Sequence, residues 1–186
     1  MLYELRKTVV LVGLMGAGKT AVGRALARSL EVGFVDQDDE IEAAANASVS
    51  EIFAEYGEAF FREKESQVLD RLLDGPPCIL STGGGAFIQA RNRDLIASRA
   101  IAVWLNADLN LLWTRVRHRS HRPLLRTENP FATLQALYDA RYGIYALAPV
   151  HVRPDPSWSP QNTAEAVIHA LADRSEILKE RHDAPR

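Results

Sequence analysis

The sequence of 186 residues has little cysteine, no excess of basic residues and no long apolar run. Cys78 is its single cysteine, which excludes an intrachain disulfide and a zinc site built from several cysteines, as is common in a reducing compartment. The chain has 22 Lys and Arg against 24 Asp and Glu, and this net charge of −2 disfavours a general nucleic-acid binder. No apolar run reaches the roughly 18 residues of a membrane helix, and the N-terminal MLYELRK lacks the apolar core of a signal peptide. We therefore expect a cytoplasmic monomer with neither nucleic acid nor membrane as a partner.

Short apolar segments alternate with longer helical patterns along the chain. Because this alternation is typical of strands joined by crossover helices, it predicts an α/β fold around a five-stranded parallel sheet. The length predicts one domain over residues 1–186. The expected strands are 8–13, 33–36, 78–81, 100–105 and 150–153. The expected helices are 19–30, 39–45, 49–56, 58–73, 88–99, 108–117, 131–146 and 163–172.

Two insertions interrupt this rhythm. Residues 38–73 hold about three helical patterns between consecutive strands, which predicts a helical subdomain projecting from the sheet. Residues 117–130, RHRSHRPLLRTENP, are polar, basic and contain two prolines, as is typical of a mobile lid. The charged tail after Asp173 is predicted to extend the last helix and to fray.

A phosphate-binding pattern follows the first predicted strand. Residues Gly13 to Thr20, GLMGAGKT, fit G-x-x-x-x-G-K-[ST] between a strand and a helix. In this pattern glycines let backbone N–H groups surround phosphates, the lysine reaches the β and γ oxygens, and the hydroxyl ligates Mg²⁺. Lys19 and Thr20 therefore predict a nucleoside triphosphate site, without deciding between a kinase, a switch protein and a motor.

Two carboxylates end the second predicted strand. In an extended chain Asp36 and Asp38 would face the same side, at the sheet edge where α/β proteins bind ligands. One carboxylate could hold Mg²⁺ and the other could accept a hydrogen bond from a substrate hydroxyl. The alternative is that Asp38 or Asp39 only caps the next helix.

Three glycines and three arginines indicate the second substrate. Gly83, Gly84 and Gly85 follow the third strand, where they would allow close backbone approach to a ligand. Ser81 carries no charge for a metal, so Asp36 is the better candidate ligand. If arginines 62, 122 and 141 converge, they predict an anionic acceptor, although each alone is more typical of a solvated surface.

These residues belong to a longer ordered set of motifs. GLMGAGKT is followed by FVDQDDEIE, VSEIFAEYGEAFFREKE, STGGGAF and HRPLL, over most of residues 9–150. With this combination the sequence resembles the shikimate kinase family, whose members phosphorylate the 3-hydroxyl of shikimate. The resemblance implies a P-loop three-layer α/β/α fold, with a helical substrate-binding insertion at 38–73 and a lid at 117–130. It also implies ATP and shikimate as substrates and Mg²⁺ as cofactor.

The resemblance further implies a role for each matching residue. The catalytic residues would be Lys19, Asp38 and Arg122, and the metal ligands Thr20 and Asp36. Shikimate would contact Asp38, Phe53, Phe61, Arg62, Gly83, Gly84, Gly85 and Arg141. ATP would contact Gly16, Ala17, Gly18, Lys19, Thr20, Ala21, Arg115, Arg122 and Pro160. The segment RPDPSWSPQN around Pro160 departs from the family pattern.

Two alternatives remain open at this point. A gluconate-type or nucleotide monophosphate kinase would share the phosphate loop and the lid, but the FRxxE, GGG and RPLL motifs disfavour it. An ATP-binding regulatory protein of the same fold could have lost activity, although every catalytic position named above is filled.

Overall fold

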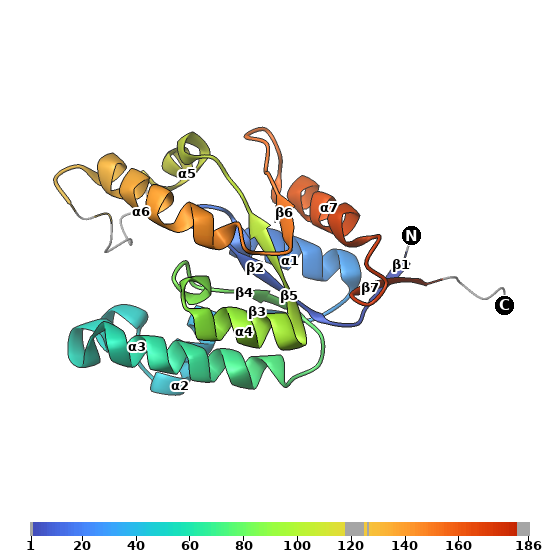
Figure 1. The fold of residues 1–186 in the computed structure, drawn as a ribbon, viewed down its shortest axis with the longest axis horizontal. Coiled ribbons are helices and arrows are strands. Elements are labelled where there is room, and N and C mark those ends of the chain that lie inside the picture. Colours follow the sequence, from blue (N-terminus) through green and yellow to red (C-terminus); the bar gives the residue numbers. More distant parts are fainter. Residues whose placement is uncertain (1, 118–124, 126, 182–186) are drawn as a thin grey trace.

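A five-stranded parallel sheet forms the centre of the computed structural model, which describes residues 2–117, 125 and 127–181 (Figure 1). The strand order is β3 (Phe34–Asp36), β4 (Ile79–Ser81), β2 (Thr8–Val12), β5 (Ala100–Leu105) and β6 (Val150–Val152). All five predicted strands are therefore confirmed. Because the strands are parallel, their carboxyl ends share one edge, where the motif loops lie.

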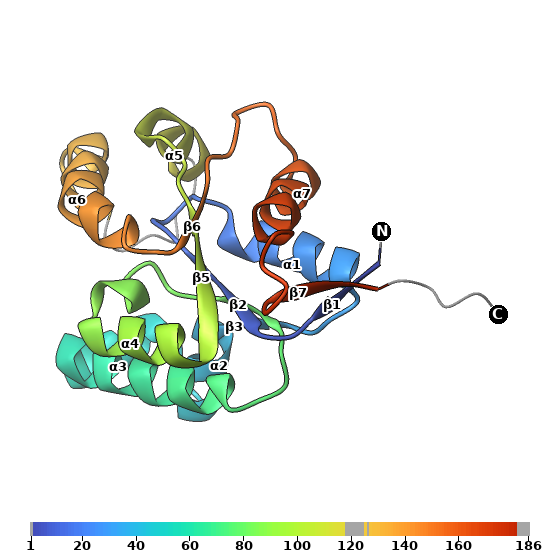
Figure 2. The ribbon, with the colours of Figure 1, turned by 45° about the vertical axis from the view of Figure 1, so that its right-hand side comes forward.

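Helices cover both faces of this sheet and complete three layers (Figure 2). One face carries α1 (Lys19–Leu30) and α7 (Pro160–Leu171), which pack against each other. The other carries α3 (Val49–Leu73) and α4 (Ala90–Arg99), the latter preceded by the 3₁₀ turn η1 (Ala86–Ile88). Helices α5 (Leu109–Val116) and α6 (Pro130–Tyr145) pack together beyond the carboxyl end of β5.

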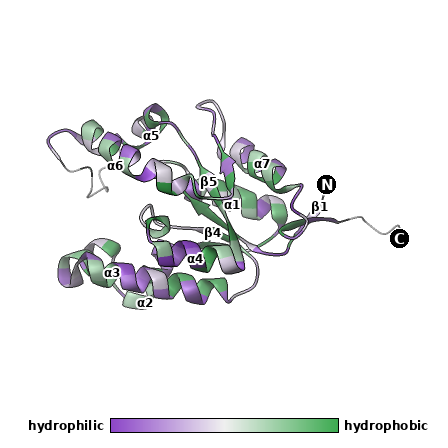
Figure 3. Ribbon diagram, in the orientation of Figure 1, coloured by the Kyte–Doolittle hydropathy of each residue, from purple (hydrophilic) through white to green (hydrophobic). Residues whose placement is uncertain are grey.

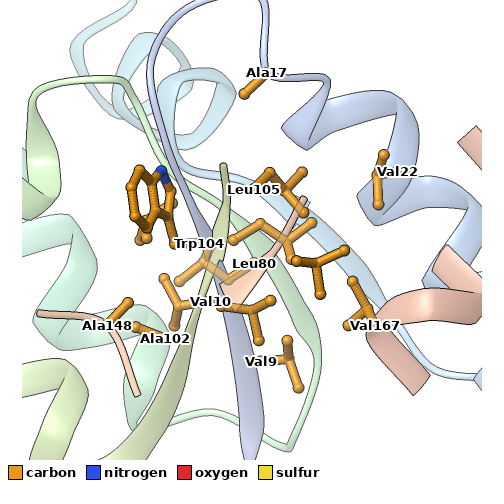
Figure 4. Close-up of a cluster of buried hydrophobic side chains, with 14 of the residues drawn as sticks. Val9, Val10, Ala17, Val22, Leu80, Ala102, Trp104, Leu105, Ala148 and Val167 are labelled. Atoms are coloured by element: carbon orange, nitrogen blue, oxygen red, sulfur yellow. The ribbon is translucent and has the colours of Figure 1, made fainter. Parts of the chain in front are cut away.

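The core sits around the two central strands. Every residue of β2 and β5 is buried, as expected of parallel strands covered on both faces, and both strands are largely hydrophobic (Figure 3). Val10, Leu80 and Leu105 meet in one cluster between the layers (Figure 4). This packing makes the sheet a rigid support for the loops at its carboxyl edge.

The predicted helical insertion consists of α2 (Gln37–Ala45) and α3. Ser48 caps α3 through a capping box with Glu51, and the helix breaks at Gly57, where φ is 81°. The two helices expected on either side of Gly57 thus form one broken element. A small separate core of Ile41, Ile52, Phe61 and Val68 packs α2 against α3.

The predicted helical tail is wrong. Residues Leu178–Arg181 form β7, which pairs antiparallel with β1 (Leu2–Leu5) in a separate two-stranded sheet. Ile177 and Leu178 are buried there. The local sequence pattern of neither segment indicates that the two pair. Within the described part of the chain, no helix is long and apolar enough to cross a membrane.

Candidate active site

The phosphate loop joins β2 to α1 in a backbone shape that needs glycine. Gly16 and Gly18 have φ values of 84° and 95°, and a Cβ on Gly16 would lie 2.7 Å from Val116 Cγ1. Gly18 is the N-cap of α1 and provides no side-chain cap. The N–H groups of the first helical turn are therefore available to a phosphate, where the helix dipole favours negative charge.

Two cations lie against this loop. Lys19 Nζ donates to the carbonyl oxygens of Gly13 at 2.7 Å and Leu14 at 3.2 Å. Arg115 Nη1, from α5, donates to the carbonyl oxygens of Gly16 at 3.3 Å and Ala17 at 3.2 Å. Two of the three predicted ATP-binding cations, Lys19 and Arg115, thus lie at the phosphate loop.

Thr20 and Asp36 form an oxygen pair suited to Mg²⁺. Thr20 Oγ1 donates to Asp36 Oδ2 at 2.9 Å and lies 3.5 Å from Ser81 Oγ. No group of three or more His, Cys, Asp or Glu side chains within the described residues could hold a metal ion. A hydroxyl and one carboxylate nevertheless fit Mg²⁺, which usually keeps several waters and binds substrate phosphates.

Contrary to the prediction, the aspartate pair does not lie in one extended strand. The strand ends at Asp36, which is the N-cap of α2 and accepts the Asp38 N–H at 3.1 Å. Asp38 therefore lies in the first helical turn, so the alternation of an extended chain does not apply to it. Neither Asp38 nor Asp39 is the cap. Gln37, between Asp36 and Asp38, is buried, and its Nε2 donates to the Glu65 carbonyl at 2.7 Å.

Asp38 is the most perturbed carboxylate near the phosphate loop. Burial raises its pKa to about 6, the Asp36 carboxylate adds to the rise, and Lys19 opposes it. A Cβ on Gly83 would lie only 2.9 Å from Asp38 Oδ1. Asp38 thus sits between the phosphate loop and the triple glycine, charged at neutral pH but easily protonated.

Arg62 lies against Gly85, the last of the three glycines. Its Nη1 donates to Glu65 Oε2 at 3.0 Å, and its guanidinium lies 5.3 Å from the centre of the Phe61 ring and 6.0 Å from that of Phe53. Glu65 also accepts Gln89 Nε2 at 3.1 Å, and its side chain is 1% exposed. Glu65 is the last residue of the FRxxE motif, and no role was predicted for it, although its i,i+3 spacing from Arg62 was a usable signal.

Helix α6 contributes the second predicted arginine of this set. Arg141 Nη1 lies 3.4 Å from the Gly84 carbonyl oxygen. The buried Tyr145 hydroxyl donates to the same oxygen. Tyr145 was not singled out from the sequence, where an apolar helix face only predicts packing. Asp38, Phe53, Phe61, Arg62 and Arg141 therefore gather around Gly83, Gly84 and Gly85.

Comparison with known proteins accounts for this combination. A family model described as shikimate kinase matches residues 15–172. The chain belongs to the shikimate kinase family. It is 57% identical to a shikimate kinase of Ruegeria pomeroyi over 94% of this chain and 90% of the relative, and 56% identical to one of Cereibacter sphaeroides over 96% and 89%.

Solved structures agree with the family assignment. A shikimate kinase from Acinetobacter baumannii in complex with shikimate has a TM-score of 0.85 at 36% identity, over 90% of this chain and 94% of that one. A gluconokinase from Sinorhizobium meliloti 1021 has a TM-score of 0.62 at 17% identity, over 93% and 95%, which is similarity of fold alone.

Two nucleotide-side predictions from the resemblance, Arg122 and Pro160, stay predictions. Arg122 and most of the predicted lid lie outside the described residues. Pro160 is the first residue of α7, where Gln161 Nε2 donates to Ser29 Oγ at 3.0 Å. Ser29 lies about 15 Å along α1 from Lys19, at 1.5 Å per residue. The start of α7 is therefore tied to the far end of α1, and the contact of Pro160 with ATP remains a prediction from the resemblance.

At Gly85 a larger residue is limited by the Arg62 guanidinium rather than by backbone conformation. Its φ is −97°, but a Cβ there would lie 2.6 Å from Arg62 Cζ. Gly85→Ala is expected to displace Arg62 and raise the KM for shikimate about tenfold or more. Gly143→Ala in α6, where a Cβ has nothing within 4 Å, is the matched control and is expected to leave that KM unchanged. Steady-state kinetics of both variants measure this, and equal KM values would contradict it.

Proposed function

We propose that this protein transfers the γ-phosphoryl group of ATP to the 3-hydroxyl of shikimate, giving shikimate 3-phosphate and ADP. The observation that carries the proposal is the position of Asp38. Its carboxylate lies near Lys19 of the phosphate loop and next to Gly83, and the guanidinium of Arg62, which is paired with Glu65, lies next to Gly85. Shikimate has both a hydroxyl group, which Asp38 can bind, and a carboxylate, which Arg62 can bind.

On the nucleotide side, residues 16–21 bind the phosphates through backbone N–H groups. Lys19 leaves the loop carbonyls to contact the β and γ oxygens. Thr20 Oγ1 and the Asp36 carboxylate would hold Mg²⁺, which supplies charge neutralisation on those oxygens. Arg115 contacts the adenine side, while Arg122 meets the transferred group and Pro160 the base.

On the acceptor side, Arg62 and Arg141 bind the shikimate carboxylate and the Phe53–Phe61 pair flanks its ring. The two rings are 4.5 Å apart, so together they form one apolar wall. Arg62 can take a new anion because one of its present partners, Glu58, is 69% exposed and the pair is a weak surface interaction. Gly83, Gly84 and Gly85 bring backbone donors close to the ring.

In the reaction, Asp38 orients the 3-hydroxyl for in-line attack and accepts its proton. The bond from O3 to the γ-phosphorus forms as the bond to the bridging oxygen of ADP breaks. Because the transition state is loose, positioning and charge neutralisation matter more than a strong base, which suits a carboxylate with a pKa near 6. Closure of residues 117–130 would exclude water as a competing acceptor.

The experiment is ADP release by the purified protein with Mg²⁺ and ATP, in parallel with shikimate, gluconate, nucleoside monophosphates and no acceptor. Stimulation by shikimate alone is expected. Turnover of gluconate or a nucleotide instead would overturn the proposed acceptor, and ATP binding without turnover of any acceptor would favour the regulatory alternative. Size-exclusion chromatography tests the predicted monomeric state. The monomeric state and the cytoplasmic location both stay predictions.

Arg62→Lys tests the carboxylate site. A lysine keeps the charge but loses the planar fork that pairs with a carboxylate, so the KM for shikimate is expected to rise about 10- to 100-fold with the KM for ATP unchanged. Arg71→Lys on the same helix, whose partner is the surface residue Glu40, is the matched control. Initial rates at varied shikimate and ATP measure both constants. A rise shared by both substrates would argue against a carboxylate contact.

A further inference from the structure

Tyr145 is the last residue of α6, and its side chain is buried against the triple glycine. Its hydroxyl donates to the Gly84 carbonyl oxygen, which Arg141 Nη1 also approaches at 3.4 Å. The ring is 3% exposed and stacks at 6.2 Å on Trp104 of β5. One carbonyl oxygen therefore receives two donors from the same helix.

The Gly84–Gly85 peptide unit lies where three elements meet. A Cβ on Gly84 would lie 3.7 Å from the Met15 nitrogen of the phosphate loop and 4.0 Å from the Tyr145 hydroxyl. A Cβ on Gly85 would meet the Arg62 guanidinium on α3. This peptide is thus bordered by the phosphate loop, by α6 and by the proposed carboxylate-binding arginine.

Holding the carbonyl of this peptide also fixes its N–H. A trans peptide is planar, so the Gly85 N–H points away from the Gly84 oxygen. Since that oxygen is turned toward Tyr145, the N–H is turned away from α6. The Gly84 and Gly85 N–H groups make no hydrogen bond to any residue that the structure describes, so both remain free to donate to a ligand.

We propose that Tyr145 is a positioning residue of the acceptor site, which orients the Gly84–Gly85 peptide so that its N–H binds shikimate. This inference rests on the proposed function for its ligand. It assigns the role to the hydroxyl rather than to the ring, because Trp104 already packs the ring and phenylalanine would preserve that contact. Burial raises the pKa of Tyr145 to about 12, so the hydroxyl remains a donor across the working pH range.

The same contact links the acceptor site to α6. Arg141 lies one helical turn before Tyr145, and both side chains reach Gly84. A shift of α6 would therefore move the proposed carboxylate ligand and the glycine peptide together. Tyr145 keeps the distance between these two groups constant, which a side chain that only fills the core would not do.

Tyr145→Phe in the full chain tests the role of the hydroxyl, with Tyr142→Phe as the matched control. Tyr142 is on the same helix and its ring also packs against Trp104, at 4.9 Å, but it is 41% exposed. Tyr145→Phe is expected to raise the KM for shikimate about 3- to 10-fold, the effect of one lost hydrogen bond, while the KM for ATP stays unchanged. Tyr142→Phe is expected to change neither constant.

Amide hydrogen exchange supplies a readout that does not need turnover. In Tyr145→Phe the unliganded peptide covering residues 82–88 is expected to exchange faster, with no change in the phosphate loop. An unchanged KM for shikimate, an equal rise in Tyr142→Phe, or a lower melting temperature with both KM values unchanged would overturn the proposal. Failure of the wild-type protein to use shikimate would instead overturn the proposed function, and exchange at 82–88 would still report whether the tether exists.

Discussion

Asp38→Asn is expected to lower kcat about 100- to 10,000-fold while leaving shikimate and ATP binding largely intact. The amide keeps the size of the carboxylate and can still contact a hydroxyl, but it cannot accept the proton that leaves O3. Asp39→Asn is the matched control, because Asp39 is the neighbouring residue and is exposed. Single-turnover and steady-state rates measure the effect, and near-normal turnover by Asp38→Asn would contradict the role of the carboxylate.

The same substitution is expected to stabilise the folded protein. Burial raises the pKa of Asp38 in the folded state to about 6, above the ordinary 3.8, so the charged carboxylate destabilises the fold at neutral pH. Asp38→Asn removes that charge and should raise the free energy of unfolding at pH 7 by up to about 3 kcal/mol. This gain should shrink as the pH falls below 6, where the folded wild type is protonated. Denaturant unfolding at pH 7 and pH 4 measures both, and a destabilised variant at pH 7 would contradict the burial of the charge.

The pH dependence of the reaction has the same origin. As the pH falls through about 6, Asp38 is protonated and kcat/KM of the wild type is expected to decline. Asp39→Asn should show the same dependence of kcat/KM on pH. The residual activity of Asp38→Asn should not decline as the pH falls through about 6. A profile that is flat from pH 7 to pH 5 in the wild type would remove Asp38 as the proton acceptor.

Lys19→Met is expected to reduce kcat/KM for ATP about 100- to 1,000-fold, as loss of a preorganised donor to a developing charge does. The methionine preserves much of the side-chain length without the ammonium group, which now donates to the Gly13 and Leu14 carbonyls at 2.7 and 3.2 Å. Lys7→Met is the matched control, since Lys7 is exposed and precedes the amino end of β2, at the opposite edge of the sheet.

The two lysine variants distinguish a specific contact of Lys19 with ATP from an effect of the protein's net charge. If Lys19 acts on the nucleotide phosphates, its loss should weaken the use of ATP while the affinity for shikimate, measured by calorimetry, is preserved. Lys7→Met changes the net charge equally and should behave as wild type. An equal loss of activity in both variants would attribute the effect to net charge and contradict a specific contact.

The sheet could be predicted because its two central strands, β2 and β5, are almost continuous apolar runs. Such runs occur where parallel strands are covered on both faces, and residues 8–12 and 100–105 are buried throughout. The pairing of β1 with β7 could not be predicted, because it joins residues at opposite ends of the chain through backbone contacts that any sequence can make. The pattern of apolar runs therefore located the central sheet but not the pairing of the chain ends.

The candidate site shows the same limit. The motifs predicted that Asp38, Arg62 and Arg141 act together, and the structure brings them around one glycine loop. They could not indicate that Asp38 lies in a helical turn, because the strand and the helix meet within two residues. Glu65 and Tyr145 were overlooked since a buried acid and a buried phenol matter only through partners distant in sequence.

The most direct test of the central claim is the identity of the product. The purified protein would be incubated with Mg²⁺, ATP and shikimate, and the product examined by phosphorus–proton correlation NMR alongside ADP quantification. A single phosphate ester on O3, formed in equal amount to ADP, is the result that follows from a hydroxyl held by Asp38 and a carboxylate held by Arg62 and Arg141. A phosphate on another oxygen would contradict this placement of the ring, and ADP formed without any ester would contradict phosphoryl transfer to shikimate.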